Sequence, residues 1–453
     1  MPEIRVTNPA TLEELSAIPV PTNSEIDSIV ENSRIAFLEW KKTPFPKRQQ
    51  MLGQISDALA SRKEELARLL TQEQGKPLHE SLREIDAIAS VFKLYSTFSV
   101  EGEILVEDES TDISVEKEPY GVCALILPWN YPVGLLGWKL APCLLGGNSA
   151  VVKPSSFVPL AVMECISIMK ESLPQNIVQA VPGGADSGAY LSRHGGIDRI
   201  SFTGSQETGR KIMGYAAGNF PKLTLELGGN DAAIILNDCN LEKRFGSIFS
   251  GCFFNAGQIC IAIKRIYVHA SLQQDLIKKF VEKANALKVG NGLEPGTQMG
   301  PLNNEAQLKK VEDLVEDARA NGATIAAGGS RLPGEGNFYS PTVITGLDDT
   351  FRIVKEEQFG PAIPILTFSD IDDAIARAND TPYGLGGSVW TEDIEKGREL
   401  ASRLECGTAW VNAHMLLEHK APFGGWKHSG NGRELGQQGL EEFLQTRTLY
   451  VRK

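Results

Sequence analysis

Residues 121–153 read GVCALILPWNYPVGLLGWKLAPCLLGGNSAVVK, and this stretch sets the architecture of the chain. Two short apolar runs, 121–127 and 149–153, enclose a longer segment. Further short runs follow at 177–181, 199–202 and 224–226. Buried strands that alternate with helices predict βαβ crossovers and a parallel sheet. We therefore predict an α/β fold.

Three loops follow strands of this sheet, at 128–132, 153–156 and 203–209. Ligands of such sheets bind outside the carboxyl ends of the strands. The loop 203–209 places small residues before a helix, where backbone N–H groups can receive a pyrophosphate. Neither this loop nor the glycine-rich segment 182–188 has GxGxxG spacing. The residues alone leave a nucleotide site and an ordinary turn both open.

Other elements surround this unit. Helical patterns occupy 24–40, 46–61 and 63–74, and we interpret the break at Gly75-Lys76-Pro77 as an ordinary turn. Residues 101–118 alternate polar and apolar side chains, as in a strand that is wet on one face. A second α/β unit is predicted from a strand at 265–268, helices at 271–286 and 304–321, and strands at 323–326 and 342–344. The glycine-rich stretch 328–336 is expected to be a surface loop.

One cysteine stands out for chemistry, at the end of the run FFNAGQIC that closes at Cys260. A lone cysteine among apolar residues is usually inert core. Two other motifs favour a catalytic thiol, which is the strongest side-chain nucleophile. Glu226 begins the motif ELGGND, and Asn130 lies within PWNYP. An acid, an amide donor and a thiol make a catalytic set.

Composition and charge limit the possible binding partners and the cellular location of the protein. The chain has 453 residues, long enough for two or more domains, and a formal charge of −12 that disfavours nucleic acid and anionic membranes. No apolar run is long enough to span a membrane, and the first residues do not suggest a targeting signal, so we expect a cytoplasmic protein. The seven cysteines are scattered, which indicates neither disulfides nor a zinc site, and we predict no metal.

Taken together, ELGG at residue 226, the motif that ends at Cys260 and the separation between them resemble the aldehyde dehydrogenase family over nearly the whole chain. The resemblance implies a Rossmann-variant domain for NAD or NADP at 1–108 and 121–228. It also implies a catalytic domain at 229–434 and an oligomerisation ribbon at 109–120 and 435–453. The ribbon would pair across a subunit boundary with the C-terminal strand 446–451, giving a homodimer or homotetramer.

The resemblance also implies a mechanism. The Cys260 thiolate attacks an aldehyde, and Asn130 with the Cys260 backbone N–H holds the oxyanion. After hydride transfer, Glu226 activates water to hydrolyse the thioester, since burial raises a glutamate pKa toward the working pH. A CoA-acylating enzyme or a catalytically silent protein is an alternative. Family members that acylate CoA lack a glutamate at position 226. A catalytically silent protein would be free to lose the thiol, the acid or the amide, and this chain has all three.

Lys153 is expected at the adenosine ribose, Glu357 at the nicotinamide ribose and Phe359 against the nicotinamide ring. Ser156 stands where many NAD-preferring members carry glutamate, so we expect NADP to be accepted. The expected cofactor residues are Leu127, Pro128, Trp129, Lys153, Ser155, Ser156, Gly184, Gly188, Phe202, Thr203, Gly204, Ser205, Leu227, Gly228, Glu357 and Phe359.

The substrate is expected to be a medium-sized aliphatic or aromatic aldehyde. The expected substrate residues are Tyr131, Trp138, Phe254, Ile259, Ile261 and Met415. Residues 403–407 resemble succinate-semialdehyde dehydrogenases, which leaves a semialdehyde as the alternative substrate, although no Arg or Lys is clearly placed for a distal carboxylate. His414 and His419 are expected to be polar surface groups without a catalytic role.

Overall fold

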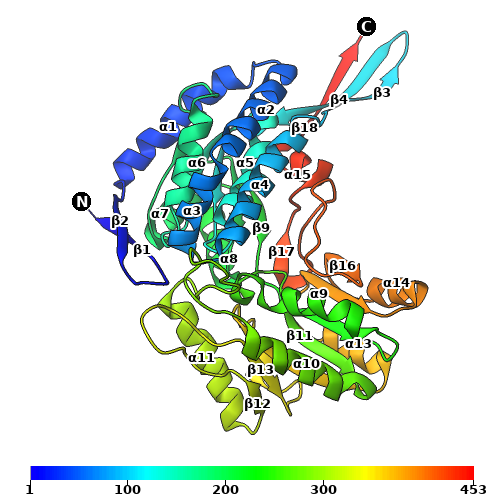
Figure 1. Ribbon diagram of the computed structural model, residues 1–453. Coiled ribbons are helices and arrows are strands. Elements are labelled where there is room, and N and C mark those ends of the chain that lie inside the picture. The colour runs from blue at the N-terminus through cyan, green and yellow to red at the C-terminus, as the bar shows by residue number, and fades with distance from the viewer. Residues whose placement is uncertain (1, 101) are drawn as a thin grey trace.

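The computed structural model describes residues 2–100 and 102–453 and contains two large sheets covered by helices, with a β arm that projects from the body (Figure 1). The first sheet has the strand order β17-β9-β8-β5-β6-β7. Its strands are β5 (Val122–Ile126), β6 (Ser149–Lys153), β7 (Val178–Ala180), β8 (Arg199–Thr203), β9 (Lys222–Glu226) and β17 (Gly430–Asn431). All pairs are parallel except β17 with β9.

This strand order is that of a Rossmann unit. From β5 the chain adds β6 and β7 on one side and then β8 and β9 on the other, so the direction of strand addition reverses between β5 and β8. Helices cover both faces, and alternate residues of β5 show it. Cys123 and Leu125 pack in one core cluster with helices α2 to α6, whereas Ala124 and Ile126 pack in another with α1, α7 and α8. The continuous apolar runs of the sequence are therefore strands buried on both sides.

The helices of this half agree with the periodic segments of the sequence. They are α1 (Asn23–Trp40), α2 (Phe45–Ser61), α3 (Lys63–Gln74), α4 (Leu78–Tyr95), α5 (Pro132–Leu145), α6 (Leu160–Lys170), α7 (Ala185–Arg193) and α8 (Gln206–Ala216). A hairpin of β1 (Glu3–Thr7) and β2 (Glu14–Pro19) precedes them. The predicted helices at 24–40, 46–61 and 63–74 are confirmed to within one residue.

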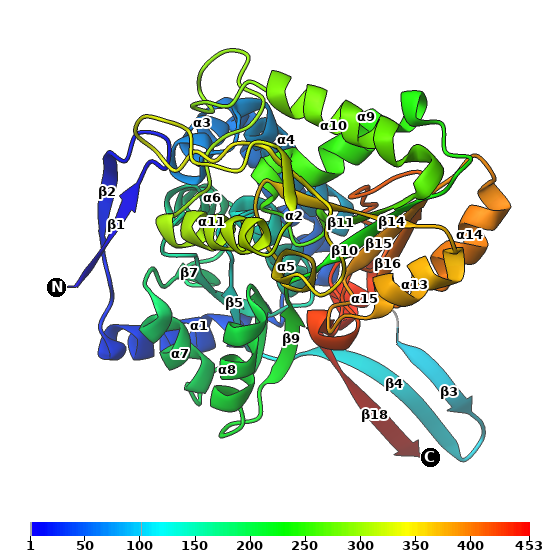
Figure 2. The same ribbon diagram turned by 90° about the horizontal axis from the view of Figure 1, so that it is seen from below.

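The second sheet has the order β12-β13-β14-β11-β10-β15-β16, with only β12 antiparallel to its neighbour. Its strands are β10 (Asp231–Ile235), β11 (Ile263–His269), β12 (Thr324–Ala327), β13 (Thr342–Thr345), β14 (Ala362–Phe368), β15 (Gly386–Trp390) and β16 (Thr408–Val411). Its helices are α9 (Leu241–Phe253), α10 (Gln273–Ala286), α11 (Glu305–Ala320), α12 (Arg352–Lys355), α13 (Ile371–Asn379) and α14 (Ile394–Ser402). The view from below shows this half beside the first (Figure 2).

The arm is a three-stranded antiparallel sheet of β3 (Glu103–Glu107), β4 (Thr111–Pro119) and β18 (Leu444–Arg452), entered through α15 (Gly436–Glu441). The expectation that the ribbon pairs with the C-terminal strand across a subunit boundary is wrong. Leu444–Arg452 pairs with Thr111–Pro119 of the same chain over its whole length. The C-terminal end of the chain lies on the arm, whereas the N-terminal end lies beside the β1–β2 hairpin (Figure 1).

Among residues 2–100 and 102–453, no helix is long and apolar enough to cross a membrane.

Candidate active site

Two cavities meet at Cys260. The first, here called the sheet cavity, has a volume of about 430 Å³ and lies outside the carboxyl ends of β5, β6 and β8. The second, here called the aromatic cavity, has a volume of about 440 Å³ and lies between α4, α5, α9 and the segment 413–423. Cys260, Asn130, Thr203 and Leu227 belong to the walls of both. A thiol at this junction can contact ligands in either cavity.

The turn before Cys260 is conformationally demanding. After α9, a short 3₁₀ turn (Phe254–Gly257) contains three successive residues with positive φ: Asn255 at 48°, Ala256 at 53° and Gly257 at 71°. A Cβ on Gly257 would lie 2.5 Å from the Gly360 carbonyl oxygen, so only glycine fits there. Left-handed backbone at a non-glycine residue costs roughly 1–2 kcal/mol. Such strain is typical of functional sites that the surrounding structure holds in place.

Cys260 is partly buried, whereas the other six free cysteines are buried. Burial raises the pKa of the Cys260 thiol to about 12, and the carboxylates of Glu357, Asp231 and Glu226 act in the same direction. The ammonium of Lys264 acts in the opposite direction. A thiol with a pKa in this range is protonated at rest.

Asn130 is anchored to the turn that carries Cys260. Its side-chain Nδ2 donates to the Gln258 carbonyl at 3.0 Å. The Asn130 carbonyl accepts from Lys76 Nζ at 2.8 Å, and Lys76 Nζ also donates to Glu84 Oε2 at 2.6 Å. The Lys76 and Glu84 side chains are fully buried. The interpretation of Gly75-Lys76-Pro77 as an ordinary turn was therefore incomplete, because its lysine belongs to a buried network below Asn130.

Glu226 ends β9 and faces the aromatic cavity. It is 3% exposed, and neither of its carboxylate oxygens has a hydrogen-bond partner among residues 2–100 and 102–453. Burial raises its pKa well above the ordinary value, and the charge of Glu434 adds to this effect. Glu434 itself pairs with the buried Lys139. An unpartnered acid of raised pKa in a cavity is suited to general base chemistry.

The sheet cavity contains every residue expected at the cofactor, since Leu127, Pro128, Trp129, Lys153, Ser155, Ser156, Gly184, Gly188, Phe202, Thr203, Gly204, Ser205, Leu227, Gly228, Glu357 and Phe359 all line it. Burial lowers the pKa of Lys153 to about 8. Phe359 meets Trp129 edge to face at 5.4 Å between ring centroids. The sequence interpretation missed Thr208, Lys211, Ile212 and Tyr215, which also line the cavity. Their spacing along α8 is that of one helix face, which was the available signal.

This cavity suits an extended dinucleotide. The N-terminus of α8 opens on it, and Thr203 Oγ1 is buried without a partner in the part of the chain that the structure describes. A Cβ on Gly184 would meet nothing within 4 Å, so the wall is open there. Free N–H groups at a helix start suit a phosphate, and a lysine and a carboxylate farther along suit ribose hydroxyls.

The aromatic cavity contains all the expected substrate residues, which are Tyr131, Trp138, Phe254, Ile259, Ile261 and Met415. Trp138 and Phe423 meet at 5.3 Å between ring centroids. Arg83 also lines the wall, with its guanidinium 6.0 Å from the Phe254 ring centroid. The expectation that no Arg or Lys is placed for a distal carboxylate is therefore wrong. Arg83 lies on α4 with Glu84 and Ala87 of the same wall, far in sequence from the expected substrate residues.

His414 is not a surface group, which corrects the expectation for it. Its side chain is fully buried, with Nδ1 2.9 Å from Ser388 Oγ and Nε2 2.8 Å from the Ile261 carbonyl. Burial lowers its pKa to about 3, so the ring is neutral and braces the residue after Cys260. His419 is half-buried and lines the aromatic cavity.

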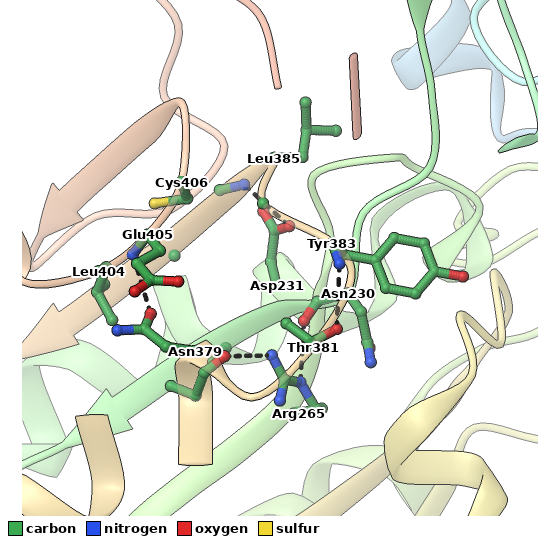
Figure 3. Close-up of a pocket in the computed structure, with 15 residues that line it drawn as sticks. Asn230, Asp231, Arg265, Asn379, Thr381, Tyr383, Leu385, Leu404, Glu405 and Cys406 are labelled. Atoms are coloured by element: carbon green, nitrogen blue, oxygen red, sulfur yellow. Dashed lines mark hydrogen bonds between the residues drawn. The ribbon is translucent and has the colours of Figure 1, made fainter. Parts of the chain in front are cut away.

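A third, small cavity of about 20 Å³ lies between β10, β15 and the segment 378–387 (Figure 3). Asp231 and Arg265 lie on its wall, and Arg265 Nε donates to the Asn230 carbonyl at 2.9 Å. The volume accommodates about one water molecule. Across the two described ranges, no group of three or more His, Cys, Asp or Glu is arranged to hold a metal ion.

The sequence matches the aldehyde dehydrogenase family over residues 2–449. Retinaldehyde dehydrogenase 3 of Rattus norvegicus is 37% identical over 98% of this chain and 89% of its own length. Betaine aldehyde dehydrogenase of Bacillus subtilis is 38% identical over 98% of this chain and 93% of its own length.

Solved structures agree. An aldehyde dehydrogenase from Bacillus cereus superposes with a TM-score of 0.97 at 36% identity, covering 99% of this chain and 93% of that chain. A betaine aldehyde dehydrogenase from Staphylococcus aureus in complex with NAD⁺ gives a TM-score of 0.96 at 36% identity, covering 99% and 92%. The chain therefore belongs to the aldehyde dehydrogenase family.

Proposed function

We propose that the protein oxidises an aldehyde to a carboxylic acid with a nicotinamide dinucleotide, through a thiohemiacetal and a thioester on Cys260. The observation that carries this proposal is the position of Cys260 at the junction of two cavities, with the unpartnered Glu226 in the second. This arrangement supports a cofactor side and a substrate side with the Cys260 thiol between them.

NAD is the proposed cofactor, supported by the related structure solved with NAD⁺ and by the donor set of the sheet cavity. Lys153 and Glu357 would hold ribose hydroxyls, the start of α8 would hold the pyrophosphate, and Phe359 would pack on the nicotinamide. When bound, the nicotinamide supplies the hydride acceptor. We propose that NADP is accepted as well, because Ser156 places no carboxylate at the cavity wall.

The chain's own groups would carry the other steps. The Cys260 thiolate adds to the aldehyde carbon, and the oxyanion forms beside the Asn130 side-chain N–H and the Cys260 backbone N–H. Once the thioester has formed, Glu226 takes a proton from a water that attacks the acyl carbon, and Cys260 leaves as the thiolate. A base in the cavity beside Cys260 can activate water, so Glu226 favours water over a thiol as the acceptor.

The test is Glu226→Gln in rapid-mixing kinetics. We expect a burst of reduced cofactor close to one equivalent of enzyme, followed by a steady state at least about 10²-fold slower than wild type, because acylation does not need the base. Glu418→Gln, an exposed acid near the aromatic cavity, is the matched control and should keep the wild-type steady state. Loss of the burst in Glu226→Gln would reassign Glu226 to thiol activation or aldehyde positioning.

The aromatic and aliphatic wall of the second cavity supports a medium-sized aliphatic or aromatic aldehyde as substrate. The relatives are named for retinaldehyde and betaine aldehyde, which differ in size and charge, so their names do not narrow the choice. A panel of aldehydes followed by reduced-nicotinamide absorbance tests the proposal. Higher kcat/KM for apolar aldehydes supports it, and a preference for small hydrophilic aldehydes contradicts it.

A semialdehyde with a distal carboxylate is the second candidate, and Arg83 is the observation that favours it. Arg83 is exposed and acts on the nearby acid Glu80 through its charge alone, so its guanidinium is available to a substrate at the cavity wall. Arg83→Leu should raise KM for succinate semialdehyde at least about tenfold and leave an uncharged aldehyde of similar length unaffected. Equal KM values for both substrates in wild type and variant would remove this candidate.

We also propose that the arm assembles copies of the chain into a homodimer or homotetramer. Ile104, Leu105 and Tyr450 are 69%, 52% and 71% exposed on it, and the outer edges of β3 and β18 have no strand beside them in the described chain. Such edges are covered in most proteins. Removal of residues 446–453 should give monomers or aggregates in light scattering, and an unchanged oligomer would contradict the proposal.

The division into a cofactor domain (1–108 and 121–228), a catalytic domain (229–434) and an oligomerisation ribbon (109–120 and 435–453) is likewise a proposal, supported by the separate sheets. Two segments cross this division, since residues 430–431 lie in the first sheet and β3 pairs with β4 in the arm. A cytoplasmic location is proposed because all seven cysteines are free thiols. Detection in fractionated cells tests it.

A further inference from the structure

Lys264 occupies an unusual place beside the nucleophile. It is the second residue of β11, and its neighbour Arg265 points to the opposite face of that strand, as strand geometry requires. Arg265 donates to the carbonyls of Asn230 and Ala378, each at 2.9 Å. Lys264 turns instead into the loop that carries Cys260.

The ammonium of Lys264 is bound by the carbonyls of that loop. Nζ donates to Ile259 O at 2.7 Å and to Cys260 O at 2.8 Å, with Ala262 O at 3.5 Å. These three acceptors match its three N–H donors. The side chain is 1% exposed, so water does not screen its charge.

An acid from the sheet cavity stands on the other side of this cation. Glu357 Oε1 is 3.7 Å from Lys264 Nζ and accepts the Gly229 N–H at 3.0 Å. A Cβ on Gly229 would lie 2.6 Å from the Cys260 carbonyl oxygen, so these segments are in close contact. The nucleophile loop, the exit of β9 and Glu357 therefore form one packed unit around the ammonium.

The other ionisable groups near Cys260 are acids or are neutral. Asp231, Glu226 and Glu357 disfavour the thiolate through their charges, and His414, which contacts Ile261 O, is neutral above pH of about 3. Lys264 is the group whose charge favours the thiolate. A buried cation bound only by carbonyls and one distant carboxylate retains most of its field.

We propose that Lys264 is a positioning residue for the nucleophile: its ammonium fixes the loop 259–262 and stabilises the Cys260 thiolate, and Glu357 limits that stabilisation. The proposal rests on the proposed role of Cys260 and adds the group that makes a buried thiol reactive. It goes beyond the catalytic set of Cys260, Glu226 and Asn130.

The experiment measures the alkylation rate of Cys260 by iodoacetamide from pH 6 to 10.5 without cofactor or aldehyde, with the modified peptide identified by mass spectrometry. Below the thiol pKa the rate follows the thiolate fraction. Lys264→Met should slow alkylation at pH 8 at least about tenfold, as expected for a pKa one unit higher. Lys264→Gln, which keeps N–H donors without the charge, should also slow it. Lys264→Arg should stay within about threefold of wild type.

Glu357→Gln gives a test of opposite sign that does not alter Lys264. Removing this carboxylate should speed alkylation at pH 8 by at least about threefold. Lys309→Met is the matched control, since it removes an exposed cation of α11 that does not line the cavity or contact the loop, and its profile should equal that of wild type.

Two results overturn the proposal. One is a pH profile of alkylation equal to that of wild type in both Glu357→Gln and Lys264→Gln. Lys264 would then only support the structure of the loop, even if Lys264→Met reacts slowly or fails to fold. The other is a wild-type profile in folded Lys264→Met. Failure of the proposed function can be distinguished from these two results. If Cys260 is not the reactive thiol, Cys260→Ala would incorporate as much iodoacetamide label as wild type at pH 8.

Discussion

The two cavities that meet at Cys260 are similar in volume, about 430 and 440 Å³, but they are built in different ways. Most of the sheet cavity is formed by loops that directly follow β5, β6 and β8 and by α7 and α8, and the second half of the chain adds Cys260, Gln307, Lys310, Glu357 and Phe359. The aromatic cavity collects residues from α4, α5, α9, β9 and the segment 413–434. The first cavity therefore depends mainly on local sheet topology, whereas the second forms only after many distant segments have packed.

The two sides also differ in what holds their polar groups. The sheet cavity uses the helix start at Ser205, whose side chain accepts the Thr208 N–H. Buried ion pairs support the aromatic cavity, with Lys76 and Glu84 on one wall and Lys139 and Glu434 near Glu226. Charges removed from water need partners, so substitutions there should have larger effects on stability than those in the sheet cavity.

The largest expected effect belongs to the atom that the two sides share. Cys260→Ala should lower aldehyde oxidation by on the order of 10⁴-fold or more, because no covalent intermediate can form. Dinucleotide binding, followed by quenching of tryptophan fluorescence, should change by less than about threefold. Cys252→Ala, a buried thiol on α9, is the control and should retain turnover. Inactivation that follows Cys252 in place of Cys260 would mean that the two cavities do not share a nucleophile.

The next effect tests the buried pair below the aromatic cavity. Lys76→Met leaves Glu84 buried without its cation and should lower the free energy of unfolding by about 3–5 kcal/mol, measured by urea denaturation. Glu84 Oε1 also accepts the N–H groups of Val133 and Gly134, and a glutamine keeps an acceptor there. The double variant Lys76→Met with Glu84→Gln should therefore recover part of the loss. Equal stability of the single and double variants would show that the charge is not the cause.

Asn130 should have a somewhat smaller effect, on turnover alone. Asn130→Ala removes one oxyanion donor and should lower kcat by about 10²–10³-fold, roughly 3–4 kcal/mol. Its backbone neighbours still line the sheet cavity, so the Kd of the dinucleotide should stay near the wild-type value. A loss of dinucleotide affinity with unchanged kcat would mean that Asn130 binds the dinucleotide in the sheet cavity and does not hold the oxyanion.

These contrasts explain what the sequence could predict. Strand, loop and helix alternate at regular spacing through residues 121–226, so residues such as Thr203 and Ser205 could be placed at the carboxyl ends of strands before the structure was known. The motifs around Cys260 and Glu226 gave the catalytic set by resemblance. Lys76, Arg83 and His414 were misjudged, because their positions depend on contacts with segments far away in the chain. Burial of a single lysine in a short turn has no local signature.

The smallest expected effect concerns the far end of the sheet cavity, where Ser156 is partly buried on the wall. A glutamate there would accept hydrogen bonds from a ribose diol and repel a 2′-phosphate, whereas the serine leaves that phosphate near Lys153, whose ammonium is the nearby counter-charge. Ser156→Glu should therefore lower kcat/KM for NADP relative to NAD by at least about tenfold, or 1.4 kcal/mol. Burial already lowers the Lys153 pKa to about 8, so NADP use by wild type should weaken as pH rises through that value and the cation is lost. Steady-state kinetics with both cofactors from pH 6.5 to 9 measure both effects, and Ser156→Ala separates the lost hydroxyl from the added charge. If the two cofactors keep their ratio in Ser156→Glu, the choice between them is made elsewhere, and the face of α8 that carries Lys211 becomes the next place to test.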